Sequence, residues 1–208
     1  MLKTPILKRN LIYETYQGKL IIGVMGTHKG VGVTHSCILL ANYLGRCLGK
    51  KTALIECYPQ NDFKFIEDEL VSNDNNMKES KSFELHKVTY YKSIKSREIS
   101  EIIGDDYDCV VLDLGCDLIN GKYEFLRCDK KLVISSMTPW KLHELDKFVM
   151  NNEHIKNSYQ WIYLIPFGSK KDINIIKKDF NLKVNQIPCE PDPFIISSSV
   201  IQLFQTVI

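Results

Sequence analysis

The amino-acid sequence predicts a doubly wound α/β fold, in which helices cover both faces of a mainly parallel sheet. Short apolar runs alternate with segments of helical periodicity, which is the pattern of such a sheet. The first run, residues 20–25, is apolar on both faces, as expected for a central parallel strand. With 208 residues the chain can bury a core on each side of one sheet, so we expect a single domain over residues 1–208.

The expected elements follow this alternation in order. We expect strands at residues 20–25, 52–57, 83–91, 107–114, 131–136, 161–167 and 184–187. We expect helices at residues 34–48, 63–71, 94–103, 139–151, 172–180 and 194–208. Pro139 is expected to open the fourth helix, with Trp140 available for burial. Residues 1–18 form an N-terminal extension in which residues 11–13 fit a short edge strand, and the polar residues 72–82 fit a mobile surface loop.

Composition and charge indicate an ordinary cytoplasmic protein. The net charge is +2, from 27 basic and 25 acidic residues, which is too balanced to indicate nucleic-acid binding by itself. The seven cysteines form no CxxC pair, and several lie inside apolar runs, so we expect reduced and mostly buried thiols. The sequence has no apolar run of membrane-spanning length and no secretory signal pattern at its start. We therefore expect the chain in the cytoplasm, at most peripheral to the inner face of the membrane.

A glycine-rich turn after the first strand has the features of a phosphate-binding loop. In such a loop the backbone N–H groups and the N-terminus of the following helix attract an anion, and glycines let the phosphates approach. The usual pattern is GxxxxGK[ST]. Here Gly32, Val33 and Thr34 stand where Gly-Lys-Thr is expected, and Thr27 takes the place of the first glycine. The loop therefore departs from the pattern at two positions, and a purely structural turn is the alternative.

The surrounding residues resemble the MinD/ParA family of P-loop ATPases. The run THKGVGVTH, residues 27–35, resembles the family's deviant Walker A motif GKGGVGKTT, with the family's two lysines falling on His28 and Val33. The run ALIECYPQN, residues 53–61, resembles its LLIDxDPQ segment, with Glu56 in place of the aspartate. The run DCVVLDLG, residues 108–115, resembles its Walker B region, with Asp113 at the strand end. Among the atypical members, the TadZ/CpaE proteins of Tad pilus assembly are the most similar in character, because they pair this fold with an altered Walker A motif.

The resemblance implies a site for ATP or ADP with Mg²⁺. The implied nucleotide-binding residues are Thr27, His28, Lys29, Gly30, Val31, Gly32, Val33, Thr34 and His35. The implied Mg²⁺ ligands are Thr34, Glu56 and Asp113, and Asp113 is the one candidate for a catalytic role. In the family the loop lysine contacts the phosphates. Because Val33 carries no charge, we expect weakened binding and slow or absent hydrolysis, with Lys29 as the nearest substitute cation.

The same resemblance implies three candidate functions. The first is a spatial or assembly factor for a pilus or secretion machine, in the manner of TadZ/CpaE, acting as a homodimer at the cytoplasmic face of the membrane. The second is an active partitioning or septum-site ATPase. The third is a nucleotide-free pseudoenzyme that binds only protein partners.

Several other features have simpler interpretations. The lysine pairs at residues 170–171 and 177–178, with Lys183 beyond, fit a solvated helix face better than a DNA-binding surface. The apolar C-terminal segment lacks basic residues, so we expect it to pack on the sheet rather than to enter a membrane. The aspartates at 105, 106 and 108 fit a solvated turn. Neither the cysteines at 109 and 116 nor the histidines at 28 and 35 have the spacing of an iron–sulfur or metal site.

Overall fold

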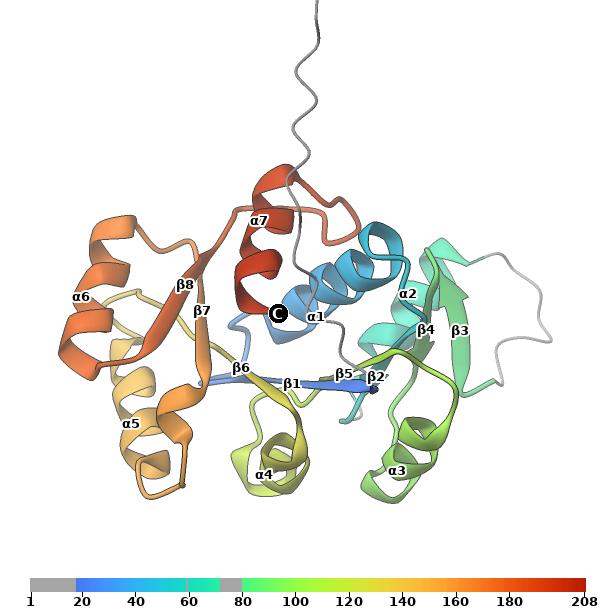
Figure 1. Ribbon diagram of the computed structural model, residues 1–208, viewed down its shortest axis with the longest axis horizontal. Helices are drawn as coiled ribbons and strands as arrows, with labels where there is room; N and C mark the ends of the chain where they lie inside the picture. Colours follow the sequence, from blue (N-terminus) through green and yellow to red (C-terminus); the bar gives the residue numbers. More distant parts are fainter. Residues whose placement is uncertain (1–17, 59, 72–79) are drawn as a thin grey trace, which may run out of the picture.

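One twisted sheet runs through the middle of the structure, a computed structural model that describes residues 18–58, 60–71 and 80–208 (Figure 1). Its strands are β1 Leu20–Gly26, β2 Thr52–Glu56, β3 Ser82–Leu85, β4 Val88–Tyr91, β5 Cys109–Asp113, β6 Lys130–Ile134, β7 Ile162–Pro166 and β8 Lys183–Ile187. They lie in the order β3-β4-β2-β5-β1-β6-β7-β8, and every pair except β3–β4 is parallel. This arrangement confirms the predicted fold class.

Helices cover both faces of the sheet, each over its own apolar core. The helices are α1 Val33–Asn42, α2 Asp62–Leu70, α3 Ser96–Gly104, α4 Leu118–Arg127, α5 Leu142–Asn152, α6 Lys170–Phe180 and α7 Ser198–Val207, with the shorter η1 Tyr43–Cys47 and η2 Ser158–Gln160. Figure 1 shows α1, α2 and α7 above the sheet and α3, α4 and α5 below it. Helix α6 belongs to the lower core through Ile173 and Ile176. Strands β2 and β5 are buried along their whole length, as central parallel strands should be.

The C-terminal helix packs on the sheet, as the sequence predicted. Val200, Phe204 and Val207 of α7 are buried in the upper core, and the rings of Phe204 and Tyr43 lie 5.4 Å apart. Within the described residues, no helix combines the length and the apolar character needed to cross a bilayer.

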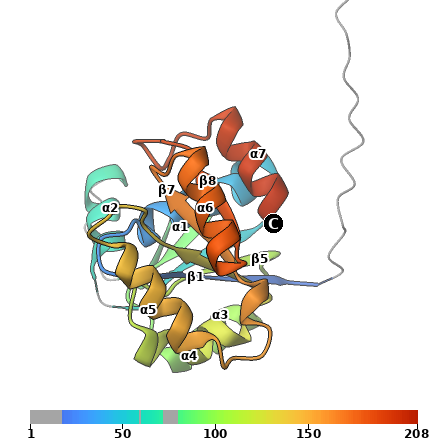
Figure 2. The same ribbon diagram turned by 90° about the vertical axis from the view of Figure 1, so that its left-hand side faces the viewer.

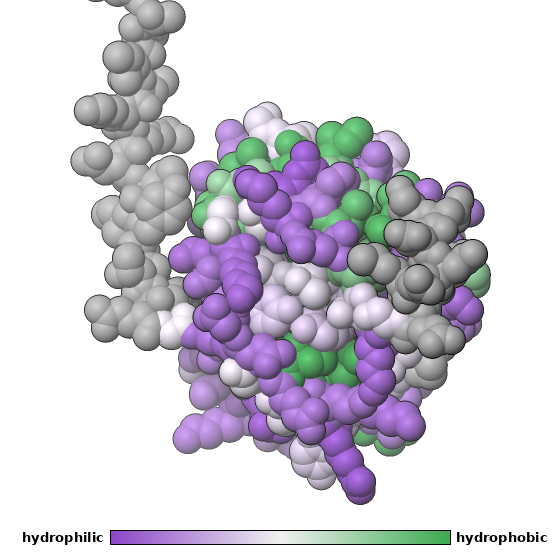
Figure 3. All heavy atoms as spheres, turned by 90° about the vertical axis from the view of Figure 1, so that its right-hand side faces the viewer, coloured by the Kyte–Doolittle hydropathy of each residue, from purple (hydrophilic) through white to green (hydrophobic). Residues whose placement is uncertain are grey.

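The single strand predicted at residues 83–91 is wrong, because the structure has a hairpin there. Strands β3 and β4 pair in antiparallel fashion around His86 and Lys87, whose φ angles are 52° and 65°. Positive φ at both central residues is the geometry of a tight two-residue hairpin turn. An Asn-Gly or Asp-Gly pair would have indicated such a hairpin in the sequence, but the turn here is His-Lys. The short β3 forms the edge of the sheet on a side of the molecule that is largely hydrophilic (Figure 3).

Helix α4 was missed, and the start of α5 was predicted too early. Asp117 caps α4 by accepting hydrogen bonds from the backbone N–H groups of Ile119 and Asn120, at 2.9 and 3.2 Å. Helix α5 begins at Leu142 rather than at Pro139, so Trp140 lies in the preceding turn and is 72% exposed instead of buried. The end of the first predicted helix also differs, because residues 43–47 form a π-helical turn. The edge strand expected at residues 11–13 and most of the loop at 72–82 lie outside the described residues.

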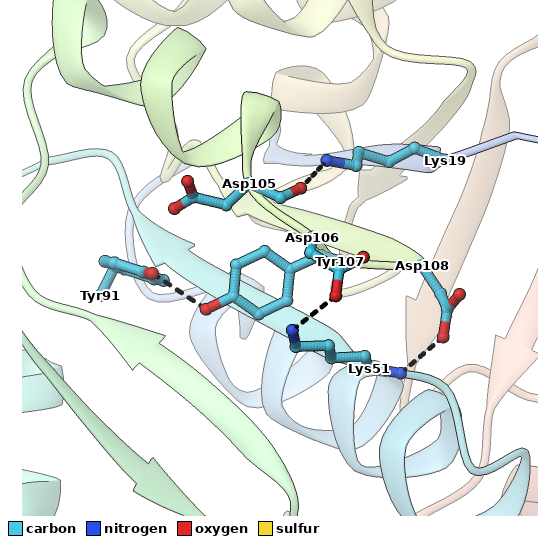
Figure 4. Close-up of polar contacts among 7 residues, drawn as sticks. All are labelled: Lys19, Lys51, Tyr91, Asp105, Asp106, Tyr107 and Asp108. Carbon is cyan, nitrogen blue, oxygen red and sulfur yellow. Dashed lines mark hydrogen bonds and ion pairs between the residues drawn. The ribbon is translucent and has the colours of Figure 1, made fainter.

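The aspartate turn before β5 is at the surface, as predicted, and it is also tied to the sheet (Figure 4). Lys51 donates its backbone N–H to the Asp108 carboxylate at 2.8 Å and its ammonium to Asp106 at 3.0 Å. The same ammonium lies 5.6 Å from the centre of the Tyr107 ring, and the Tyr107 hydroxyl is 2.9 Å from that of Tyr91. These contacts fix the edge of the sheet at which the parallel strands begin.

Candidate functional site

The phosphate-loop region lies where β1, β2, β5 and β6 end side by side. β1 is held between β5 and β6, and the loop continues these pairings: Gly26 donates to the carbonyl of Gly115 at 2.7 Å, and Thr27 donates to that of Ile134 at 2.9 Å. On the other side of β5, Cys57 donates to the carbonyl of Asp113 at 3.0 Å. Doubly wound sheets bind their ligands at this end of the sheet, outside the carboxyl ends of the strands.

Two glycines give the loop an open cradle at the N-terminus of α1. Gly30 and Gly32 have φ angles of 77° and 98°, which other residues rarely adopt. A Cβ built at either position would meet no heavy atom within 4 Å, so the space in front of them is open. Gly32 is the N-cap of α1, whose first N–H groups have no intrahelical partner. The loop therefore offers backbone donors, the positive end of a helix dipole and room for a phosphate.

The interior of the loop is filled by two valines. Val31 and Val33 are each only 8% exposed. A Cβ on Gly26 would lie 2.7 Å from a methyl carbon of each valine, so both side chains pack against that glycine. The residue that stands in the position of the loop lysine is thus a buried apolar contact. Lys29, predicted as the substitute cation, is exposed at the rim of the loop.

A chain of polar contacts joins the loop to the end of β6. The Thr27 hydroxyl lies 3.1 Å from Nδ1 of His28 and 3.1 Å from the Ser135 hydroxyl. Burial lowers the pKa of His28, and the nearby positive charge of Lys141 lowers it further, so the neutral imidazole is favoured. His28 therefore adds a hydrogen-bonding group to the loop rather than a fixed positive charge.

Thr34 and Asp113 face each other at the bottom of the site. Asp113 is 2% exposed and accepts a hydrogen bond from the backbone N–H of Gly115 at 3.1 Å. Burial, together with the negative charges of Glu56 and Asp62, raises the pKa of Asp113 to about 6, against the opposing effect of the hydrogen bonds from Thr34 and Gly115. The Thr34 hydroxyl also lies 3.4 Å from the Asp62 carboxylate. A hydroxyl and a carboxylate at the end of a phosphate loop are suitable Mg²⁺ ligands.

Glu56, the third predicted Mg²⁺ ligand, is occupied by other groups. Although β2 places it in register with Asp113, it is 2% exposed and both its oxygens accept hydrogen bonds. One oxygen accepts the backbone N–H groups of Asp62 at 2.9 Å and Phe63 at 3.4 Å, and the other accepts the N–H and hydroxyl of Ser93 at 2.9 and 2.8 Å. Burial raises the pKa of Glu56 in spite of these bonds. The geometry makes Glu56 an anchor for the start of α2 and leaves Thr34 and Asp113 as the remaining candidates among the predicted Mg²⁺ ligands.

The remaining predicted residues lie where the loop joins α1. His35 is half-buried in the first turn of α1, one residue after Thr34. The structure adds Asp62 and Ser135, which sequence reasoning missed. Asp62 is the first residue of α2 and Ser135 directly follows β6, so each stands next to a strand or helix end that was predicted. No group of three or more histidine, cysteine, aspartate or glutamate side chains within the described ranges is arranged to hold a metal by itself. Mg²⁺ usually takes one or two protein ligands and completes its shell with phosphate and water, so this arrangement fits a nucleotide-bound ion.

Solved structures of MinD and ParA proteins share this fold. A plasmid partition protein from Borrelia burgdorferi bound to AMPPNP has a TM-score of 0.66 and 16% sequence identity, covering 92% of this chain and 100% of its own. MinD from Aquifex aeolicus has a TM-score of 0.62 and 16% identity over 83% of each chain. A MinD protein from Pyrococcus horikoshii complexed with Mg-ADP has a TM-score of 0.60 and 15% identity, covering 91% and 94%. No protein-family model matches the sequence, and no curated protein matches it significantly. The likeness therefore shows that the chain has the MinD/ParA-like P-loop fold.

Proposed function

We propose, from this shared fold and from the geometry of the loop, that the chain binds ATP or ADP with Mg²⁺ more weakly than a loop with the lysine would, and hydrolyses it slowly or not at all. One observation carries the proposal. The loop keeps an open glycine cradle at the start of α1, while the position of the loop lysine is taken by the buried Val33. The first feature supports phosphate binding, and the second removes a charge that would stabilise a transferring phosphate.

Each part of the site has a role in this proposal. The backbone N–H groups from Gly30 to Thr34 hold phosphate oxygens, and the Thr34 hydroxyl and Asp113 carboxylate hold Mg²⁺. Bound Mg²⁺ supplies positive charge that neutralises the phosphate oxygens. Lys29 and the neutral His28 lie at the rim, where they can contact outer phosphate oxygens. Two of the similar structures contain AMPPNP and Mg-ADP, which supports this choice of ligand.

Holding the ion requires an ionised Asp113. Because burial raises the pKa of this carboxyl group to about 6, it is largely ionised at neutral pH and becomes protonated in mild acid. We therefore expect the Mg²⁺-dependent part of nucleotide affinity to fall as the pH drops through 6.

The slow or absent hydrolysis that we propose favours a role in assembly over a role in rapid catalysis. We propose that the chain acts as a spatial or assembly factor for a pilus or secretion machine at the cytoplasmic face of the membrane, in the manner of TadZ/CpaE proteins. The bound nucleotide would set a homodimeric state through the loop face. An active partitioning or septum-site ATPase is the second candidate, because the similar structures include a plasmid partition protein and MinD proteins. A pseudoenzyme that binds only protein partners is the third candidate.

Calorimetric titration with ATP and with ADP, each with and without Mg²⁺, tests the binding proposal. We expect saturable binding that is tighter with Mg²⁺, and light scattering of the same samples should show a nucleotide-dependent dimer. Turnover stimulated by DNA would favour the partitioning ATPase instead. Absence of binding to both nucleotides would contradict the proposal and favour the pseudoenzyme.

A further inference from the structure

Two adjoining hollows lie at the end of the sheet where the parallel strands begin, opposite the end that carries the phosphate loop. They open where β6, β7 and β8 begin, which is the end on the right of Figure 2. Their volumes are about 410 and 480 Å³, and they share Lys130, Ile162 and Lys183 as lining residues. The shared residues are the first residues of three neighbouring strands, and we call the two hollows together the lysine hollow.

Lysines from four parts of the chain meet in the lysine hollow. Besides the two shared lysines, Lys177 of α6 lines one part, and Lys131 and Lys156 line the other. Lys177 and Lys183 were predicted to belong to a solvated helix face, but here they lie beside a lysine from the middle of the chain. The topology brings these charges together, and no sequence motif predicts this clustering of lysines.

The positive charge of the lysine hollow exceeds its negative charge. Its lining includes one acidic residue, Asp129, whose carboxylate accepts the backbone N–H of Ile21 at 2.8 Å. Within residues 18–58, 60–71 and 80–208, none of the five lysines forms an ion pair, and Lys131 donates to the carbonyl of Cys128 instead.

This concentration of charge exceeds that of the whole chain. The net charge of the protein is only +2, so the chain outside the lysine hollow carries a small net negative charge. Bringing like charges together without partners is unfavourable, and an anion bound among them relieves that cost. The arrangement therefore favours an anionic ligand.

The chemistry of the lining indicates which kind of anion fits. All the cationic side chains are lysines, which act as point charges suited to phosphate, and none is an arginine, which would suit planar carboxylates. Each volume is within the range of small-molecule sites. Trp161 is only 4% exposed and offers no face on which a nucleic-acid base could stack. Neighbouring side-chain amides can donate hydrogen bonds to phosphate oxygens: Asn157, Gln160 and Asn185.

We propose that the lysine hollow is a second anion site, which binds a small soluble molecule carrying two or more closely spaced phosphate groups. It lies at the opposite end of the sheet from Gly30 and Gly32, so it is separate from the proposed nucleotide site. A ligand there would contact α6, α7 and three strands at once, and could thereby regulate the stability of this half of the sheet.

Inorganic triphosphate is the probe for this site, and two-dimensional NMR of the full chain is the measurement. We expect saturable shifts of the backbone amides of Lys130, Lys183 and Asn185, with an affinity that falls as salt is raised. The variant Lys130→Gln/Lys183→Gln removes both shared charges and should weaken this binding about tenfold or more, which corresponds to the loss of one or two charged contacts. The matched control Lys64→Gln/Lys147→Gln removes two exposed lysines elsewhere and should bind as the native chain does.

The outcomes separate this proposal from the nucleotide proposal. Shifts confined to the amides of residues 27–35 would overturn the second site while leaving the nucleotide site intact. Unchanged affinity in the Lys130→Gln/Lys183→Gln variant would also overturn it, provided that a thermal melt shows the variant folded. Binding to duplex DNA, or to vesicles containing a polyphosphorylated lipid, without binding to soluble triphosphate would assign the surface to a macromolecule and contradict the proposal. If only the nucleotide proposal is wrong, triphosphate will shift the backbone amides of Lys130 and Lys183 as expected, and the amides of residues 27–35 will not shift.

Discussion

Val33 determines how charge is distributed in the phosphate loop. Its side chain packs against Gly26 beside Val31, so the loop is closed by apolar contacts where a lysine would extend along the same path. The backbone donors of the cradle are unaffected by this change. At the scale of single residues, the site therefore keeps the geometry of phosphate binding and lacks one charge.

Restoring that charge should restore affinity. We expect Val33→Lys to bind Mg-ATP about tenfold more tightly or better, because a hydrogen bond to a charged group contributes about 1.5–3 kcal/mol. Calorimetry measures the change. Val33→Met is the matched control, since it adds length without charge and should not gain affinity. Equal affinities in the two variants would show that the charge at this position is irrelevant.

The carboxyl group of Asp113 should make stability depend on pH. Its folded-state pKa is raised to about 6 from an ordinary 3.8, so the folded protein binds this proton more tightly than the unfolded chain. The resulting stability is present below about pH 4 and is lost as the pH rises through 6. Asp113→Asn should therefore be more stable than the native chain at pH 7.5, by up to about 3 kcal/mol, and the difference should vanish near pH 4.

Denaturant unfolding at several pH values measures this effect. Asp179→Asn changes an exposed carboxylate of α6 and serves as the control, with no expected change in the pH profile. A constant difference between Asp113→Asn and the native chain at all pH values would contradict the account.

At the scale of elements, Glu56 ties the end of β2 to the start of α2 and to the turn before α3. Its two oxygens accept four hydrogen bonds from Asp62, Phe63 and Ser93. Ser93 has a φ of 50°, so this turn depends on contacts that hold it in an unusual conformation.

Replacing Glu56 should therefore affect stability more than metal binding. We expect Glu56→Gln to lower the free energy of unfolding by about 1–3 kcal/mol, because an amide nitrogen would face N–H donors, and to leave the Mg²⁺ dependence of nucleotide binding intact. Glu69→Gln, on the exposed face of α2, is the control. Native stability combined with a lost Mg²⁺ dependence would instead identify Glu56 as a metal ligand.

Helix α7 contributes to the core rather than to a membrane surface. Phe204 is 1% exposed and contacts the ring of Tyr43. We expect Phe204→Ala to destabilise the fold by about 3–5 kcal/mol, whereas Gln205→Ala on the exposed side should have little effect. Chemical denaturation measures both. A variant that unfolds normally but no longer sediments with lipid vesicles would contradict the packing role.

The elements that could be predicted are those whose sequence pattern is decided locally. Apolar runs gave the central strands within one or two residues, because a strand buried on both faces requires such a run. The hairpin at His86 and Lys87 could not be predicted in the same way, since its turn residues have no strong preference for positive φ. Helix α4 contains Gly121, where a Cβ would lie 3.0 Å from the Tyr58 hydroxyl and 3.1 Å from the methyl carbon of Met25, and this packing demand is visible only in three dimensions.

The candidate site was predictable to the same degree. The loop residues and Asp113 follow from position, because parallel strands end at one edge of the sheet. The engagement of Glu56 by Ser93 joins residues that are 37 positions apart, and it could not be read from the sequence.

At the scale of the whole molecule, the end of the sheet where the parallel strands begin differs in its chemistry from the end where they finish. One end carries the glycine cradle with Thr34 and Asp113, and the other carries the turn tied by Lys51 and the lysine hollow. The proposed nucleotide site and the proposed second anion site therefore lie at opposite ends of the parallel strands.

The fate of bound nucleotide tests the central claim most directly. The chain is held at equilibrium with Mg²⁺ and a saturating concentration of radiolabelled ATP in a dialysis cell, and it is sampled over time to measure and identify the nucleotide that is bound. We expect the label to stay with the protein as ATP over minutes to hours. Rapid conversion of the bound label to ADP would contradict the account, and so would recovery of a folded protein that carries no label.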